Sequence, residues 1–246
     1  MCESYREQLQ RLVGALGQSN SQAVVDDLQP GSSLERVRLF VDGNSEKRFE
    51  KLSDQLEFVA EAFDNFERQI EVFVREQPLS AYDTGVSDGE RMLLWLLDKR
   101  SLTPVQRDYV LCQRARHAVE ELARCHRAGH LRFQRLRGLQ PADVAGIDLN
   151  QVRLHVNPIR ANSTFITSAL LDSLSEPPTE VLFFPDNHEI ATAVLEPFAL
   201  QSLHKLAAIE PCTLQQWADE LGCELSALVE IARELLEVGL LAAELN

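Results

Sequence analysis

The stretch CTLQQWADELGCELSALVEIARELLEVGL (residues 212–240) has the pattern of a helix-turn-helix. Threonine is a common helix N-cap, so we expect a first helix over Thr213–Leu221. Gly222 is expected to end that helix, because glycine adopts the left-handed conformation of a helix C-terminus without strain. A second helix is predicted over Glu224–Gly239. Such a motif is typical of DNA-binding proteins.

The charge of the chain argues against a nucleic-acid ligand. From Pro211 onward the sequence has seven carboxylates and one basic residue, Arg233. The whole chain of 246 residues has a formal net charge of −14. Binding to DNA or RNA requires lysine and arginine to neutralise phosphates, and anionic membranes attract basic segments for the same reason. We therefore expect neither nucleic acid nor a membrane as a partner.

The cysteines and the hydropathy pattern predict a cytoplasmic protein. Five cysteines are scattered without a C-x-x-C pair, as is typical of reduced thiols in the cytoplasm. The first ten residues, MCESYREQLQ, have neither the basic nor the apolar region of a signal peptide. No run approaches the ~20 apolar residues that are needed to span a bilayer.

The overall pattern predicts a mainly α fold with a small β-sheet, in which residues 1–140 form an α-helical bundle. A first helix is expected over Glu3–Leu16 and a turn at Pro30–Ser33. The next helix begins near Leu34, and Asp42–Asn44 could bend or interrupt it, because Asp-Gly sequences favour turns.

An aromatic stripe follows, and Pro104 is expected in the first turn of a later long helix. Apolar residues recur three or four positions apart, which predicts helices with one buried face. The residues of this stripe are Phe49, Leu52, Leu56, Val59, Phe63, Phe66, Ile70 and Phe73.

Residues 141–246 are predicted to form a second domain with a winged-helix-like fold. Three β-like runs come first: VRLHVNPI, EVLFFP and ATAVLEPF. The last two are separated by DNHE, which predicts a tight turn. Three helices follow, over Leu200–Ile209 and the two predicted above.

The last helix carries more apolar surface than a small domain needs to bury on one side. Its apolar residues cover an arc of about 160°. If the strand Ala191–Pro197 lies beside it, strand and helix form a groove to which an extended peptide adds as a further strand. Arg233 could then pair with an acidic residue of the peptide. The predicted peptide-binding residues are Ala191, Ala193, Leu195, Leu225, Val229, Ala232, Arg233 and Leu236. The alternative is a helix wholly buried between this domain and the bundle.

The segment Arg107–Arg137 is basic within an acidic chain, with eight arginines, three histidines and three acids. Arginine makes bidentate contacts with phosphate and carboxylate groups. The segment could bind RNA or dock onto an acidic neighbour. The acidic remainder and the absence of interleaved aromatic residues favour docking. The predicted partner or substrate interface is Arg114, His117, Arg124, His126, Arg127 and His130.

Signals for catalysis are weak. His126 and His130 could share a metal on one helix face, near Cys125, but a third ligand is not obvious, and we predict no metal site. The chain has no GxSxG, glycine-rich phosphate loop, HExxH or dinucleotide motif, so no catalytic residue is predicted. Asp42, Asp83 and Asp88 are predicted to lie in loops with glycine, where turn formation explains them.

Three segments resemble the partner-subunit family of multinuclear non-haem iron-dependent oxidative enzymes. LERVRLFVDGNSEKRFEKLSDQLEFVAEAFDNFERQIEVFV (34–74) resembles its N-terminal signature, R-x-x-x-Y-x-x-N followed by aromatic helices, with Phe40 at the Tyr position and Asn44 one place late. RARHAVEELARCHRA (114–128) resembles an arginine-rich helix of the family, and VRLHVNPIRANSTFITSAL (152–170) resembles a strand segment.

The C-terminal half resembles the winged-helix recognition element for precursors of ribosomally synthesised, modified peptides. The similarity spans roughly residues 30–245. The length of the chain is more similar to the thiaglutamate (TglI) type than to the shorter methanobactin (MbnC) type.

The resemblance implies a specific function. Such proteins form a heterodimer with a TIM-barrel iron enzyme, which holds the iron, so no cofactor is expected in this chain. The winged domain captures the leader of a precursor peptide, and the iron enzyme oxidises a cysteine of that peptide. For the TglI type the implied reaction is excision of the β-carbon of a C-terminal cysteine. The resemblance thus implies a required, non-catalytic subunit, while the residues themselves leave open whether the chain is an enzyme.

Two other functions remain open at this point. The helix-turn-helix could belong to a transcriptional regulator, which would bind DNA tightly and in a salt-sensitive manner. Alternatively, the chain could be an enzyme with its own metal at His126 and His130.

Overall fold

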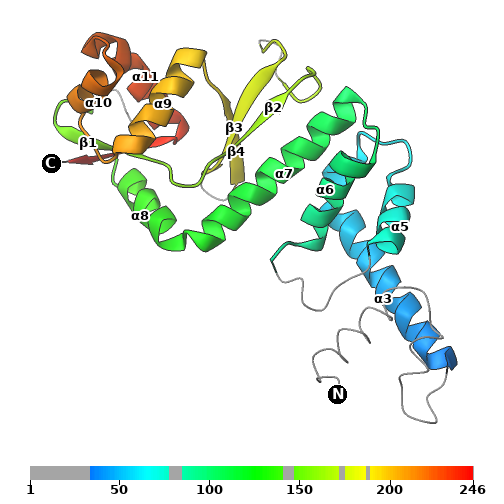
Figure 1. The fold of residues 1–246 in the computed structure, drawn as a ribbon. Coiled ribbons are helices and arrows are strands. Elements are labelled where there is room, and N and C mark those ends of the chain that lie inside the picture. The colour runs from blue at the N-terminus through cyan, green and yellow to red at the C-terminus, as the bar shows by residue number, and fades with distance from the viewer. Residues whose placement is uncertain (1–33, 78–84, 141–146, 172–174, 187–188, 246) are drawn as a thin grey trace, which may run out of the picture. The chain divides into compact units, whose positions relative to one another are not determined.

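The computed structural model describes residues 34–77, 85–140, 147–171, 175–186 and 189–245 (Figure 1). They are mainly helical with small antiparallel sheets, in agreement with the predicted fold class. The predicted helix Glu3–Leu16, the turn at Pro30–Ser33 and Asp83 lie outside the described residues. In the described part of the chain, every helix is too short or too polar to cross a membrane.

The chain divides into two compact units, residues 1–113 and 114–246. The division lies inside helix α7 (Pro104–Cys125), whereas the change in sequence texture suggested a boundary near residue 140. The reason is that α8 (Arg127–Gly138) packs against the strand β5 (Leu241–Leu245), so it belongs to the C-terminal unit. The sequence texture marks where strands begin, not where the unit begins.

The N-terminal unit is helical and has one apolar core. Its elements are α3 (Leu34–Gln55), α4 (Glu57–Ala60), α5 (Phe66–Glu76), α6 (Asp88–Lys99) and the first part of α7. The predicted aromatic stripe is confirmed as core, because six of its eight members are buried and the other two pack against them. Residues 42–44 lie within the uninterrupted helix α3, since one glycine costs a helix only about 1 kcal/mol.

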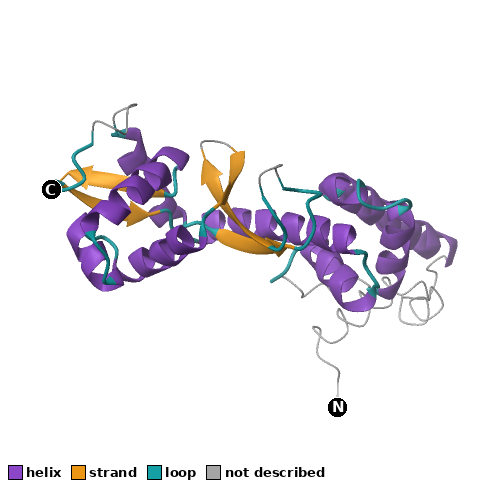
Figure 2. Ribbon diagram, turned by 90° about the horizontal axis from the view of Figure 1, so that it is seen from above, coloured by secondary structure: helices purple, strands orange, loops and turns teal. Residues whose placement is uncertain are grey.

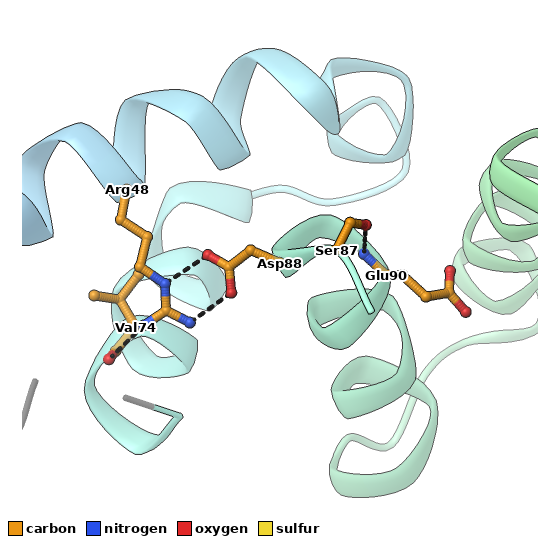
Figure 3. A network of polar contacts seen from close by, with 5 residues as sticks. All are labelled: Arg48, Val74, Ser87, Asp88 and Glu90. Carbon is orange, nitrogen blue, oxygen red and sulfur yellow. Dashed lines mark hydrogen bonds and ion pairs between the residues drawn. The ribbon is translucent and has the colours of Figure 1, made fainter. Parts of the chain in front are cut away.

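A buried ion pair joins the helices of this unit (Figure 3). The guanidinium of Arg48 on α3 donates to both carboxylate oxygens of Asp88, at 2.6 and 2.8 Å. It also donates to the carbonyl of Val74 on α5, at 3.3 Å. The interpretation of Asp88 as a turn residue is therefore incomplete: it is the first residue of α6, after the N-cap Ser87. One guanidinium thus holds α3, α5 and α6 together.

Asp88→Ala is expected to lower the free energy of unfolding of the N-terminal unit by about 3 kcal/mol, because Arg48 would stay buried without a carboxylate. The control is Glu71→Ala, which breaks the exposed pair Arg68–Glu71 and should cost less than about 1 kcal/mol. Urea unfolding followed by Trp95 fluorescence, in a Trp217→Phe background, measures this unit. Equal losses in the two variants would contradict the assigned role.

The C-terminal unit contains two antiparallel sheets (Figure 2). In the first, β1 (Val152–Val156) pairs with β5. The second has the order β2 (Ala161–Phe165), β3 (Thr179–Asp186), β4 (Glu189–Val194). Strands were predicted at β1, β3 and β4, and the β3–β4 hairpin is confirmed by its register, although residues 187–188 of the turn are outside the described part. β2 and β5 were not predicted, because ANSTF is polar and LAAEL consists of helix-forming residues.

Three helices follow the second sheet: α9 (Pro197–Ile209), α10 (Leu214–Leu221) and α11 (Leu225–Val238). The predicted ends of α10 and α11 are confirmed, whereas α9 begins at Pro197, three residues before the predicted start at Leu200. Thr213 caps α10 in a capping box with Gln216, and Gly222 ends the helix at φ 66°. Gly239 ends α11 at φ 88°. The indole of Trp217 is buried and donates to the carbonyl of Ser202, at 2.9 Å, which joins α10 to α9.

Four residues that are distant in sequence meet where α8, β3 and the end of α11 come together: Arg137, Asn157, Asp186 and Gly239. Arg137 of α8 forms an ion pair with Asp186 at the end of β3. A Cβ on Gly239 would overlap the Arg137 guanidinium, so glycine supplies both the positive φ and the space. Asn157 is fully buried and its side-chain amide lies 3.4 Å from the carbonyls of Pro185 and Gly239. We call this set the Arg137 junction.

Gly239→Ala is expected to destabilise the C-terminal unit by about 2–3 kcal/mol, from the left-handed backbone and from displacement of Arg137 out of its ion pair. Gly222→Ala is a matched control, because its φ is also positive but its Cβ would meet open space, so only the backbone cost of about 1–2 kcal/mol applies. Urea unfolding of both variants, alone and combined with Arg137→Ala, separates the two terms. If Arg137→Ala costs as much in the Gly239→Ala background as in the native chain, the junction is not coupled as described.

Candidate functional site

Strand β4 is an edge strand. It pairs with β3 on one side, from Val181↔Val194 to Asp186↔Glu189, and its other side has no strand partner in the described part of the chain. Its side chains alternate, as a half-buried strand requires. Ala191 and Ala193 are half-buried and pack against the core of the C-terminal unit, as does Leu195 just beyond the strand. The backbone groups of the free edge are the kind of template to which another strand can add.

The predicted residues of α11 lie at different depths. Leu225 and Val229 are half-buried and pack against the same core as the β4 residues. Ala232 and Leu236 are 0% and 1% exposed, so they pack into the core and do not line an open surface. Arg233 is exposed. Five of the predicted apolar residues thus pack with partial exposure against one extended core, and Arg233 lies at the surface. The main contacts of α11 are with α10 and β5 rather than with β4, so the expected position of β4 directly beside α11 stays a prediction.

Two exposed apolar residues at the end of β4 and at the start of α9 were not predicted. Val194 is 46% exposed at the end of β4, and Phe198 is 44% exposed at the start of α9. The signal was present in the alternation of the strand: with Ala193 and Leu195 facing the core, Val194 must face outward. An outward-facing valine followed by an outward-facing phenylalanine is a candidate contact for an apolar ligand side chain.

The surface of the last two helices is acidic. Glu230, Glu234 and Glu237 are exposed on α11, together with the lone Arg233. On α10, Glu220 accepts a hydrogen bond from Lys205 of α9 at 3.4 Å. A helix that reads DNA presents a polar and basic face, which this helix does not. The electrostatics of this surface thus suit a ligand without phosphate groups.

The basic helices present only part of the predicted interface to solvent. α7 ends at Cys125 and α8 begins at Arg127, so the single long helix expected across this region is broken at His126. The exposed members of the predicted interface are Arg124, His126 and Arg127, and the half-buried members are Arg114, His117 and His130. Burial lowers the pKa of His130, which favours its neutral form.

In the part of the chain that the structure describes, no three histidine, cysteine or acidic residues are grouped as a metal site would require. The exposed thiol of Cys125 donates a hydrogen bond to Glu121, at 3.2 Å. That bond raises the pKa of the Cys125 thiol, because loss of the proton would leave two negative charges in contact. Burial raises the pKa of Cys212 to about 11. Both thiols are thereby held in the form that binds metals and electrophiles poorly.

No family model, curated protein or solved structure matches this chain in the comparisons with known proteins.

Glu121→Gln is expected to shift the alkylation of Cys125 to lower pH, since the carboxylate that raises the pKa of the thiol is removed. Iodoacetamide labelling at several pH values, with the Cys125 peptide quantified by mass spectrometry, gives the midpoint. The control is Glu120→Gln, which removes a neighbouring exposed charge. An unchanged midpoint in Glu121→Gln would show that the hydrogen bond does not control the thiol.

Proposed function

We propose that this chain is an accessory subunit that binds the leader of a ribosomally made precursor peptide and presents its cysteine to a partner iron-dependent oxidative enzyme. In this proposal residues 141–246 contain a winged-helix-like recognition domain, and the iron belongs to the TIM-barrel partner. By the TglI-like resemblance, the reaction is excision of the β-carbon of a C-terminal cysteine. The chain itself is not the catalyst.

The observation that carries the proposal is the position of β4. It is the last strand of a three-stranded antiparallel sheet, has one free edge, and is followed directly by α9, α10 and α11. An extended peptide can add to such an edge through backbone hydrogen bonds, while apolar side chains select the sequence. The half-buried residues Leu195, Leu225 and Val229 pack against the core of the C-terminal unit, and the exposed Val194 and Phe198 offer further apolar contacts.

The charges support a peptide rather than a polyanion. The exposed carboxylates of α11 repel phosphate but do not oppose an extended, largely apolar segment. Arg233 gives this surface one cation, which could pair with an acidic residue of the leader.

The capped α10–α11 pair also fits a transcriptional regulator, which is the second candidate. An electrophoretic mobility shift at physiological salt separates the two: the regulator requires tight and salt-sensitive DNA binding, and the peptide-binding subunit requires none.

The proposed function is tested by its gene neighbours and by reconstitution. An adjacent gene for an iron oxidase and a short reading frame ending in cysteine are expected. The peptide encoded by that frame should bind this chain, measured by calorimetry, and should be oxidised by the iron enzyme only when this chain is present. Turnover of the peptide by the iron enzyme alone, at the same rate, would refute the role of an accessory subunit.

Val229→Asp is expected to weaken leader binding by about tenfold or more, because it places a desolvated carboxylate against the apolar anchors of the peptide. The matched control is Val238→Asp, since Val238 is 41% exposed and lies two and a half turns further along α11, on the opposite side of the helix. Circular dichroism checks that both variants fold. Equal affinity in the two variants would place the peptide elsewhere.

A further inference from the structure

Three residues form a row along the outer side of α8: Arg127, Leu131 and Arg135, referred to below as the α8 row. They are four positions apart, so they lie on one side of the helix with steps of about 6 Å along its axis. All three are exposed, and Leu131 is 42% exposed. An apolar side chain therefore stands between two guanidinium groups.

The two arginines of the α8 row form no ion pair with a carboxylate in the described part of the chain. Residues 122–138 contain five arginines and no carboxylate. Three of these arginines have an acidic neighbour: Arg124 pairs with Glu121, Arg137 with Asp186, and Arg132 lies 3.9 Å from Glu244. Among the described residues, no carboxylate forms an ion pair with Arg127 or Arg135.

The helix dipole adds to the same preference at one end of the row. Arg127 is the first residue of α8, and the first turn has no acidic residue. Cations are unfavourable beside the positive end of a helix, whereas an anion there is stabilised. An incoming carboxylate near Arg127 would therefore interact with both the guanidinium and the helix terminus.

We propose that the α8 row docks a linear acidic segment of another polypeptide, with the pattern carboxylate–x–apolar–x–carboxylate. In an extended chain alternate residues point the same way and are about 6.6 Å apart. That spacing is close to the steps of the α8 row, so the two carboxylates would meet Arg127 and Arg135 while the apolar residue covers Leu131. This inference goes beyond the proposed function, because it does not require the β4 surface.

The size of the row favours a linear segment over a folded domain. Stable interfaces between folded proteins bury about 800 Å² per partner and have cores that are depleted in charge. Among the described residues of α8 and its C-cap, the exposed large apolar residues are Leu131 and Leu139, and they stand amid exposed arginines. Acidic linear motifs are commonly recognised by arginine clusters.

The charge and the aromatic residues also favour a peptide over RNA. A nucleic acid continues beyond the row with one phosphate per nucleotide, toward a chain whose net charge is −14. Single-stranded RNA is usually held by exposed aromatic platforms, and the one aromatic residue of α8, Phe133, is buried. A short acidic peptide, in contrast, would place negative charge only beside the arginines of the α8 row.

The experiment uses the full chain and the probe fluorescein-Gly-Glu-Ala-Leu-Ala-Glu-Gly in a polarisation titration at low salt. The matched isomer Gly-Glu-Glu-Leu-Ala-Ala-Gly has the same composition without the spacing. We expect the first peptide to bind more tightly than the isomer by about threefold, with a dissociation constant below about 1 mM.

Arg127→Ala/Arg135→Ala should weaken binding of the probe about tenfold, since two exposed ion pairs are lost at about threefold each. The control, Arg68→Ala/Arg153→Ala, removes two exposed arginines elsewhere and should leave binding unchanged. The substituted arginines are exposed, so the fold should persist, which circular dichroism verifies.

Three results would overturn the inference. One is the absence of binding at about 1 mM probe. Another is an equal loss of affinity in the two double variants, which would indicate non-specific electrostatic attraction rather than a binding site. The third is tighter binding of a ten-nucleotide single-stranded RNA than of the peptide, lost in Arg127→Ala/Arg135→Ala, which would assign the row to nucleic acid.

Discussion

The contact on which the C-terminal unit depends is the guanidinium of Arg137 against Gly239 and Asp186. It joins α8, the end of α11 and the β3–β4 hairpin in one place, because a residue without a side chain leaves room for it. The buried Asn157 adds β1 to the same junction through the carbonyls of Pro185 and Gly239. A buried amide that satisfies several partners fixes one arrangement of the elements, since an alternative packing would leave it unpaired. The proposed peptide edge, β4, begins three residues after Asp186 and is positioned by this junction.

An arginine–aspartate ion pair also joins the elements of the N-terminal unit. Arg48 and Asp88 are 40 residues apart and form a bidentate, largely buried pair. Arg48 also lies over the ring of Phe73, 4.9 Å from its centre. In both units a single arginine thus joins three elements, and in both its partner is an aspartate at the end of a helix or strand.

Local signals in the sequence were sufficient for the elements whose ends are set by their own residues. Thr213, Gly222 and Gly239 define α10 and α11 through capping, which is a local interaction. β5 could not be predicted, because its sequence favours a helix and only the distant partner β1 makes it a strand. For the site, periodicity identified the apolar side of α11 but not how deeply it is covered, so Ala232 and Leu236 were assigned to a groove although they are buried. Periodicity also could not show that α7 and α8 separate at His126. This break decides which arginines face solvent.

The pairing of β1 with β5 has a consequence for how this protein is made. The side chains of His155 and Glu244, which are 89 positions apart in the sequence, form a diagonal hydrogen bond across that pair. During translation β1 leaves the ribosome before β5, and it stays unpaired while α9, α10 and α11 are synthesised. Throughout this interval Leu154 and the other apolar residues of β1 lack the strand that completes their sheet, and contacts of such high sequence separation form slowly. The nascent chain therefore exposes apolar surface of this core until β5 has been synthesised. Chaperones bind exposed apolar surface of this kind.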